Sequence, residues 1–511
     1  TITAFSSKRS SSGARPVISQ SRQIKFSSDL AKVAVTVCGG AESEGAVASV
    51  MREIVAHALA WRCSTRLRLN FAPMPSSILP SVAVTSPSSY SLTLTLVFAA
   101  ALVISLLLRL WLATRQIRHV AQHRGAVPAA FAANITLAAH QKAADYTIAK
   151  ARLGLLDLAL GGAVLLGWTL LGGLDALNQV LMNALGGGMV QQLALLAGFM
   201  LISSVIDLPL TLYKTFVLEE RFGFNKMTFK LWLADTLKSS VVGAIIGLPI
   251  AALVLWLMGA SGRYWWLWVW GVWMGFNLLM LLIYPTFIAP MFNKFQPLDD
   301  ESLKNRVTAL MQRCGFAAKG LFVMDGSKRS AHANAYFTGF GAAKRVVFYD
   351  TLLRQLDPGE VEAVLAHELG HFKHKHVPKR IVSLFAMSLA GLALLGWLST
   401  QGWFYTGLGV IPNLGGEMQA PNDALALLLF MLVTPVFSFF LSPLMAQLSR
   451  KHEFEADAYA IAQTNGGDLA RALLKLYKDN ASTLTPDPLY VKFYYSHPPA
   501  SERLARMGAS A

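Results

Sequence analysis

The chain has 511 residues, of which 54% are hydrophobic and only 14% are charged. A soluble globular protein carries about 25% charged residues, and a disordered chain has far less apolar surface than this one. Both classes are therefore excluded for most of the chain. Three cysteines are too few for a small disulfide scaffold. The composition predicts a polytopic membrane protein.

The net charge of +16 does not indicate nucleic-acid binding, because membrane proteins collect Lys and Arg in their cytoplasmic loops. The sequence contains no motif typical of DNA or RNA binding, and we predict no nucleic-acid partner. The expected partners are the lipid bilayer and a substrate. The oligomeric state is left open.

Residues 1–73 differ in composition from the rest of the chain. They are rich in serine and basic residues and show no sustained hydrophobic period. We expect them to be an upstream extension or a poorly ordered tail, with the working protein beginning near Met74. A targeting peptide is the alternative, although the acidic residues in this stretch are unusual for one.

Seven apolar runs are each near the ~20 residues that a helix needs to span a bilayer. One of them opens with a cluster of Tyr and Trp, which is typical of a membrane interface. The second run is long enough to tilt or to include a re-entrant end. The predicted spans are 91–113, 154–184, 189–213, 231–257, 264–290, 381–400 and 422–446.

The loops after the first, third and fifth spans are basic, whereas the alternate loops carry almost no Lys or Arg. The positive-inside rule then places the N-terminus outside and the C-terminus in the cytosol. We predict an all-α polytopic membrane protein with a small cytosolic α+β domain. Residues 74–290 form a membrane domain with five spans, and residues 291–380 form a cytosolic segment. Two further spans lie in residues 381–446, and residues 447–511 form a cytosolic C-terminal segment.

The cytosolic segment 291–380 has the signals of soluble structure. Residues 346–350 form a candidate strand. Asp357-Pro358-Gly359-Glu360 then predicts the start of a helix, with Asp as the cap, Pro in the first turn and Glu three residues after the cap.

On that helix lies His367-Glu368-Leu369-Gly370-His371. Two histidines four residues apart share one helical face and can bind one Zn²⁺. Glu368 is then placed to take a proton from a water that zinc has made acidic. This HExxH pattern is the arrangement of zinc peptidases. The alternative is a solvated, charged helix end.

The basic stretch that follows contains His374 and His376. We interpret these two histidines as a hydrated flank of the helix and not as ligands.

A catalytic zinc needs a third protein ligand and one open position. Glu453 and Asp457 are four residues apart after the seventh span and share a helical face. We predict Glu453 as the third ligand and Asp457 as an acceptor that orients a ligand histidine. Glu455 is a rival ligand on the other side of the helix, and His452 is a weaker one. The segment could also be an exposed charged helix.

These motifs resemble those of the type I CAAX prenyl protease family, which are integral-membrane zinc endopeptidases. The likeness runs from about residue 90 to about residue 508, and several unconnected motifs occur in the family's order. They are the HExxH helix, the Glu-Phe-Glu-Ala-Asp-Ala run at 453–458, the Asn-Ala-Tyr segment at 334–340, the loop at 215–226 and Ser-His-Pro-Pro with Arg-Leu at 496–504.

The resemblance implies seven helices around a large chamber that the zinc site caps from the cytosolic side. It assigns one Zn²⁺ per chain to His367, His371 and Glu453, the general base to Glu368 and an orienting or proton-handling role to Asp457.

The resemblance also implies four substrate-binding residues. Asn334 and Ala335 are expected on an edge strand that pairs with an extended substrate. His497 and Arg503 are expected to face the cleft, where a donor or a cation stabilises an oxyanion or holds a terminal carboxylate. His497 could instead be structural, and Arg503 could pair with Glu502 or another acid.

Three functions are compatible with the sequence. The first is endoproteolysis near the C-terminus of hydrophobic or prenylated proteins, and the second is quality control of misfolded membrane proteins. The third is a transporter or receptor with an incidental zinc site, for which Asp157, Asp207 and Asp235 are the nearest intramembrane charges. The Ala- and Leu-rich spans favour a bacterial inner membrane, and a eukaryotic source would indicate the endoplasmic reticulum.

Overall fold

The computed structural model describes residues 88–316, 320–338, 345–413 and 421–508. This part of the chain is largely helical and contains one small sheet. The predicted extension 1–73 and the end of the 334–340 motif, residues 339–340, lie outside the described residues.

Seven of the described helices are long and apolar enough to cross a membrane, as predicted. Large apolar side chains remain exposed on them: Met200 is 66% exposed and Ile245 and Val382 are each 68% exposed. Surfaces of this kind are rare on soluble proteins and fit a lipid environment. The helices are α3 (Ser89–Gln122), α4 (Leu137–Trp168), α6 (Met189–Tyr213), α7 (Phe229–Ala260), α8 (Trp265–Ile283), α13 (His376–Leu398) and α15 (Asp423–Ser438), which continues into α16 (Ser442–Gln463).

The prediction of a span at 154–184 is wrong in its bounds. α4 begins at Leu137 and ends at Trp168, and a separate short helix, α5 (Gly173–Leu185), follows. Gly172 between them has a φ of 79°, a left-handed conformation that glycine adopts without strain. The apolar composition continues across this turn, so hydropathy alone joins two helices into one run.

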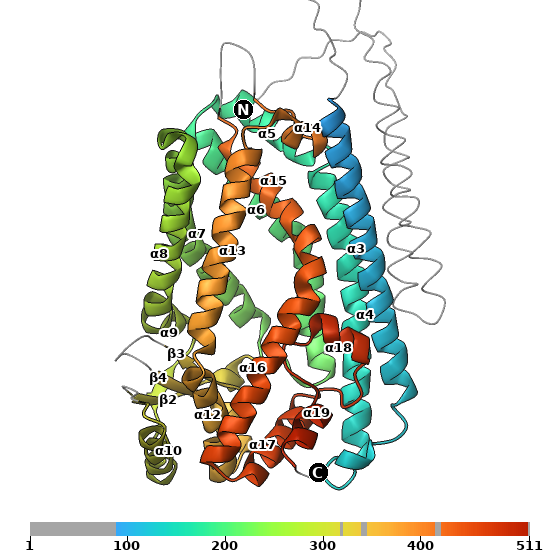
Figure 1. Cartoon of the computed structure of the whole chain (residues 1–511), viewed down its shortest axis with the longest axis vertical. Coiled ribbons are helices and arrows are strands. Elements are labelled where there is room, and N and C mark those ends of the chain that lie inside the picture. The colour runs from blue at the N-terminus through green and yellow to red at the C-terminus, as the bar shows by residue number, and fades with distance from the viewer. Residues whose placement is uncertain (1–87, 317–319, 339–344, 414–420, 509–511) are drawn as a thin grey trace, which may run out of the picture. The chain divides into compact units, whose positions relative to one another are not determined.

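The shorter helices gather at the two ends of the long ones. α5 and α14 lie at one end, and α12, α17 and α19 lie with the sheet at the other (Figure 1). The shorter helices are α9 (Ala289–Phe292), α10 (Glu301–Arg313), α11 (Asp350–Gln355), α12 (Pro358–Lys373), α14 (Gly402–Gly407), α17 (Gly466–Asp479), α18 (Pro488–Tyr494) and α19 (Ala500–Arg506).

The sheet has the strand order β1-β2-β4-β3. Its strands are β1 (Phe295–Pro297), β2 (Gly320–Met324), β3 (Ala335–Thr338) and β4 (Arg345–Tyr349). β2 and β4 are parallel, and β1 and β3 pair antiparallel on either side. The predicted strand at 346–350 is therefore confirmed as β4, one residue earlier than expected, and β3 is an edge strand.

Contacts outside the candidate metal site hold α12 in place on several sides. Its predicted capping box is present, with reciprocal hydrogen bonds between Asp357 and Glu360. Glu360 is 1% exposed and accepts a 2.7 Å hydrogen bond from Lys475 of α17. The apolar face of α12, with Leu365 and Leu369, packs into a core shared with the sheet and α10. These contacts set both the start and the rotation of the helix.

α12 and α16 approach each other very closely at one point. A Cβ atom added to Gly370 would lie 2.8 Å from the backbone Cα of Ala456 and 3.0 Å from its carbonyl oxygen. Real Cβ atoms do not come this close to backbone. Glycine at 370 is therefore what lets the face of α12 with the two histidines contact the face of α16 with Glu453.

A cavity of about 1140 Å³ lies among the membrane helices. Its wall includes residues of α3, α4, α15 and α18, and Asp207 of α6. His497 and Arg503 also line it. This agrees with the chamber that the sequence resemblance implied.

Replacing Gly370 with alanine should push the two helices apart. We expect Gly370→Ala to destabilise the protein by about 1–3 kcal/mol, the usual cost of overpacking, and to lower its zinc content. Thermal unfolding followed by intrinsic fluorescence measures the first effect. Gly243→Ala is the matched control, because a Cβ there meets nothing within 4 Å. Equal unfolding temperatures for Gly370→Ala and wild type would contradict the close contact.

Candidate metal centre

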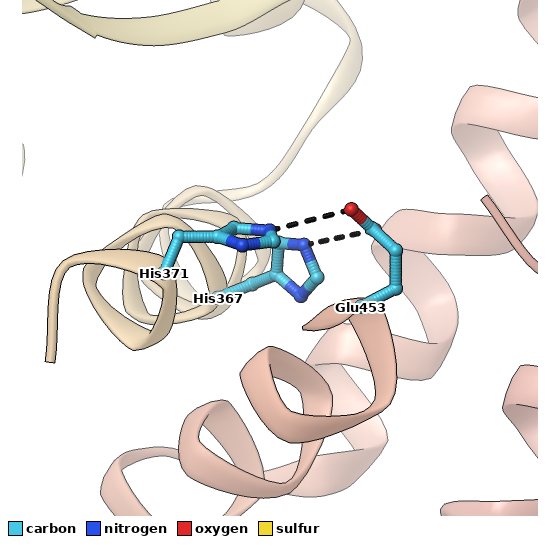
Figure 2. A group of neighbouring side chains, drawn as sticks. All are labelled: His367, His371 and Glu453. Carbon is cyan, nitrogen blue, oxygen red and sulfur yellow. Dashed lines mark ion pairs between the residues drawn. The ribbon is translucent and has the colours of Figure 1, made fainter. Parts of the chain in front are cut away.

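Two histidines of α12 face one carboxylate of α16 (Figure 2). His367 Nε2 is 3.5 Å from Glu453 Oε2, and His371 Nε2 is 3.4 Å from Glu453 Oε1. The three candidate ligand atoms lie within 4.8 Å of one another. His367 and Glu453 are buried, at 7% and 5% exposure, and His371 is half-buried. The ligand set predicted from sequence is thus brought together in space.

The chemistry of this group fits a zinc ion. Glu453 Oε2 is buried without a hydrogen-bond partner among the described residues, and a buried carboxylate oxygen in that state is costly. A cation at the cluster removes that cost. Two imidazoles and one carboxylate are also the donor set of catalytic zinc sites that keep one position open.

Asp457 orients the first histidine. His367 Nδ1 donates a 2.8 Å hydrogen bond to Asp457 Oδ1, which leaves Nε2 free to face Glu453. Burial opposes protonation of His367, but the hydrogen bond with Asp457 and the nearby Glu453 carboxylate outweigh it and raise its pKa to about 9. A metal that binds Nε2 therefore displaces the proton that faces Glu453.

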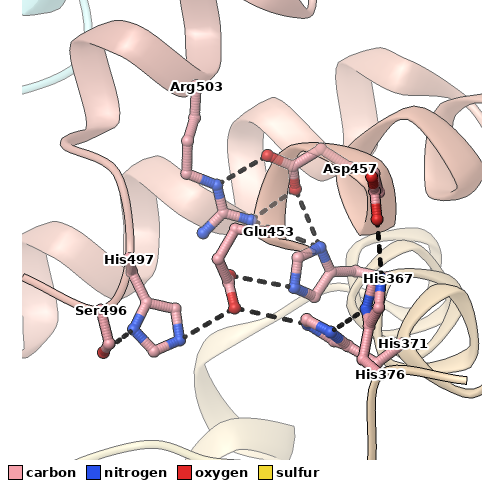
Figure 3. Close-up of polar contacts among 9 residues, drawn as sticks. His367, His371, His376, Glu453, Asp457, Ser496, His497 and Arg503 are labelled. Carbon is pink, nitrogen blue, oxygen red and sulfur yellow. Dashed lines mark hydrogen bonds and ion pairs between the residues drawn. The ribbon is translucent and has the colours of Figure 1, made fainter. Parts of the chain in front are cut away.

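Arg503 of α19 supports Asp457 in turn (Figure 3). Its Nε donates a 2.8 Å hydrogen bond to Asp457 Oδ2, and its Nη2 donates to Oδ1. The guanidinium is 7% exposed, and this two-point geometry holds the carboxylate in one orientation. Arg503 thus pairs with Asp457 and not with its sequence neighbour Glu502.

The second histidine is oriented by residues that we had not expected to contribute. His371 Nδ1 lies 3.0 Å from His376 Nδ1, and His376 Nε2 lies 2.8 Å from Glu455 Oε2. His376 is 5% exposed, so its interpretation as part of a hydrated flank is wrong. His374 is exposed, as that interpretation required. Burial of His376 depends on α16, which its own sequence neighbourhood cannot reveal.

His497 approaches the cluster from the C-terminal segment. Its Nε2 is 3.4 Å from Glu453 Oε1, and its Nδ1 is 2.9 Å from Ser496 Oγ. The ring is exposed and lines the cavity. Glu368 follows His367 on α12 and is half-buried. His497 therefore links the cavity wall to Glu453.

Asn334 and Ala335 lie at the start of β3, an edge strand of the sheet. Tyr349 N of β4 donates to Asn334 O, and the N–H of Ala335 bonds to the Asn334 side-chain oxygen at 2.8 Å. Since neighbouring residues in a strand point their backbone groups to opposite sides, the N–H of Ala335 faces the open edge of β3.

The predicted loop at 215–226 contacts the segment that precedes β3. Ala331 N donates to Phe224 O at 3.1 Å, and the Phe224 ring stacks on His332 with centroids 4.3 Å apart. This loop thus positions the start of the edge strand.

Of the three aspartates considered for a transporter, Asp157 and Asp207 line the cavity. Asp235 instead forms a 2.8 Å ion pair with Arg329.

The fold and the site together define an integral-membrane metallopeptidase. The profile of the CAAX prenyl protease N-terminal region with five membrane helices matches residues 116–294, and that of peptidase family M48 matches residues 297–510. The chain belongs to the CAAX prenyl protease family within peptidase family M48, and it is a metalloendopeptidase. This membership favours the peptidase interpretation over the transporter.

Individual relatives agree with this assignment. The CAAX prenyl protease 1 homolog of Arabidopsis thaliana is 37% identical over 335 residues, which cover 65% of this chain and 74% of the relative. CAAX prenyl protease 1 of Saccharomyces cerevisiae is 38% identical over 337 residues, 62% of this chain and 72% of the relative. The crystal structure of S. mikatae Ste24p superposes with a TM-score of 0.76 at 31% identity, covering 81% of this chain and 99% of that one.

Loss of the Asp457 charge should weaken metal binding. We expect Asp457→Asn to lower zinc affinity about 10–100-fold, the usual effect of removing a group that orients a ligand histidine. Competition with a zinc chelator of known affinity measures it on protein that elutes as a folded species. Glu502→Gln, an exposed change one residue from Arg503, is the control and should bind zinc as wild type does. Unchanged affinity in Asp457→Asn would refute the orienting role.

Proposed function

We propose that this protein is a zinc-dependent endopeptidase that cuts CAAX-type or other hydrophobic, membrane-associated proteins. The observation that carries the proposal is the buried Glu453 carboxylate, which faces Nε2 of both His367 and His371 and contacts His497 of the cavity wall. A membrane-embedded substrate could reach the site through that cavity.

Glu368 is the proposed general base. It follows the ligand His367 on α12 and, being half-buried, has access to the space in front of the cluster. Zinc, when bound, polarises the scissile carbonyl and makes water acidic enough to react near neutral pH. Glu368 takes a proton from the attacking water and passes it to the leaving amine. Asp457 and Arg503 hold His367 in one orientation throughout.

The edge strand β3 is the proposed docking line for the substrate backbone. Its pairing with β4 leaves the N–H of Ala335 on the open side, where an extended peptide can add as another strand. In this structure the N–H of Ala335 donates to the side-chain oxygen of Asn334. A substrate carbonyl that accepts from this N–H therefore replaces that hydrogen bond with another.

The cavity is the proposed site for the hydrophobic part of the substrate. Its volume of about 1140 Å³ exceeds the roughly 300–1000 Å³ typical of small-molecule pockets. It therefore has room for a peptide end together with an attached apolar chain. His497, which lines the cavity beside Glu453, is the proposed donor to the scissile carbonyl.

The basic loops favour a cytosolic location for the site. The loop after α6 and the segment between α8 and α13 carry the excess of Lys and Arg, which marks the cytoplasmic face of membrane proteins. We therefore propose that the metal centre opens to the cytosol.

A second candidate function is quality control of membrane proteins without any need for a prenyl group. It is favoured by the charged residues on the cavity wall, which include Arg109, Lys150, Asp157 and Asp207. Such a lining suits an unfolded polypeptide better than a purely isoprenoid chain.

The proposed base can be tested directly. Glu368→Gln should lower turnover of a fluorogenic farnesylated CAAX peptide by at least about 10²–10⁴-fold, the range for loss of a general base, while one zinc per chain remains bound. Detergent-purified protein, with zinc measured by atomic absorption, suffices for the assay. Chelator treatment should abolish activity, and added zinc should restore it. Residual turnover near wild type in Glu368→Gln would exclude the role.

A matched non-prenylated peptide separates the two candidate functions. Cleavage that requires the farnesyl group supports the CAAX protease, and equal cleavage of both peptides supports quality control.

The edge-strand proposal predicts a loss of substrate affinity with zinc retained. Ala335→Pro removes the outward N–H of β3 and should raise KM at least about tenfold with little change in kcat. Ala335→Ser keeps the N–H and is the control. A normal KM for Ala335→Pro would show that the substrate backbone does not pair there.

A further inference from the structure

A second group of potential metal ligands lies at the turn that joins α12 to α13. His374 and His376 flank Lys375, whose φ of 56° is left-handed, a conformation that a non-glycine residue seldom adopts. The two imidazole rings lie nearly parallel, with centroids 5.5 Å apart and an interplanar angle of 14°. The turn thus presents two neighbouring histidines side by side.

The third member comes from α16. Glu455 Oε2 is 2.8 Å from His376 Nε2, and the ligand atoms of His374, His376 and Glu455 lie within 4.8 Å of one another. Among the described residues, only this group and the catalytic one bring three such side chains together. Ligand atoms around tetrahedral zinc are about 3.4 Å apart, and the exposed side chain of His374 can close that difference by rotating.

The surroundings indicate a weak and exchangeable site. His374 is exposed and Glu455 is half-buried, so water can complete the coordination. His452 stacks on His376 with centroids 4.0 Å apart and so covers one face of that ring. Lys451 lies 3.9 Å from Glu455 and a bound cation has to displace it.

We propose that His374, His376 and Glu455 form a second zinc site, whose occupancy inhibits the enzyme. The inference rests on the proposed catalytic site, because the two sites share one hydrogen-bond chain. It concerns free Zn²⁺ in excess of the catalytic ion.

The inhibition follows from where the protons lie. When His371 binds metal through Nε2, its Nδ1 carries the proton and donates it to His376 Nδ1 across 3.0 Å. His376 then carries its own proton on Nε2 and donates it to Glu455. A metal on His376 Nε2 takes the place of that proton, so a neutral His376 must carry its proton on Nδ1. Two N–H groups then face each other, and the support of His371 is lost.

The two sites are therefore coupled, and coupling between binding sites is reciprocal. Zinc at the second site weakens the hold on the catalytic ion, and the catalytic ion weakens the second site. Loss of an orienting partner for a ligand histidine costs about 10–100-fold in affinity or activity, which sets the scale of the inhibition.

The test is a zinc titration of the detergent-purified full chain, with bound zinc and peptidase activity measured on the same samples. Wild type should bind a second zinc per chain at excess zinc and lose activity about tenfold or more as it does so. His374→Gln should bind one zinc, keep wild-type basal activity and resist excess zinc. Glu453→Gln should bind the second zinc more tightly than wild type.

His123→Gln is the control, since His119 and His123 are another close pair of histidines, with centroids 4.4 Å apart. It should behave as wild type. The proposal is overturned if wild type binds only one zinc at saturation, if His374→Gln is inhibited as wild type is, or if the second zinc disappears in His123→Gln. In each of these cases the catalytic zinc and basal activity persist, so the proposed function is judged separately.

Discussion

The whole site depends on the close contact between α12 and α16. Neither helix carries a complete ligand set, since the two histidines lie on one and Glu453 on the other. Gly370 lets the backbones meet at Ala456, and at that separation side chains of ordinary length bring their polar atoms within coordination range. The capping box, the ion pairs of Glu360 and the apolar core beneath α12 all serve to keep the helix in this position.

Neighbouring residues orient the two candidate ligand histidines in different ways. Asp457 and the buried Arg503 hold His367 in a closed, fully paired arrangement. His376 and Glu455 hold His371 through a chain that ends near solvent. The first support is rigid because Asp457 and Arg503 are both buried and are joined by two hydrogen bonds. The second ends at Glu455, which is half-buried and therefore within reach of water.

Local patterns in the sequence predicted much of this structure. The four-residue spacing in 367–371 and in 453–457 fixes which side chains share a helical face, whatever the tertiary fold. The seven spans follow from apolar content and length. Two predictions failed: one depends on a contact distant in sequence, and the other depends on a turn inside an apolar run. The burial of His376 comes from α16, and α4 ends at Trp168, before the turn with Gly172, where composition shows no break. The roles assigned to Asn334, Ala335 and His497 stay predictions.

The continuity of α15 into α16 fixes the distance between the last membrane span and the candidate metal centre. The last membrane span, α15, and the helix that carries Glu453, α16, belong to one helical stretch, Asp423–Gln463. From Ser442 to Glu453 that helix rises roughly 16 Å. Glu453, and with it the candidate metal centre, is therefore held at a set distance from the last membrane span.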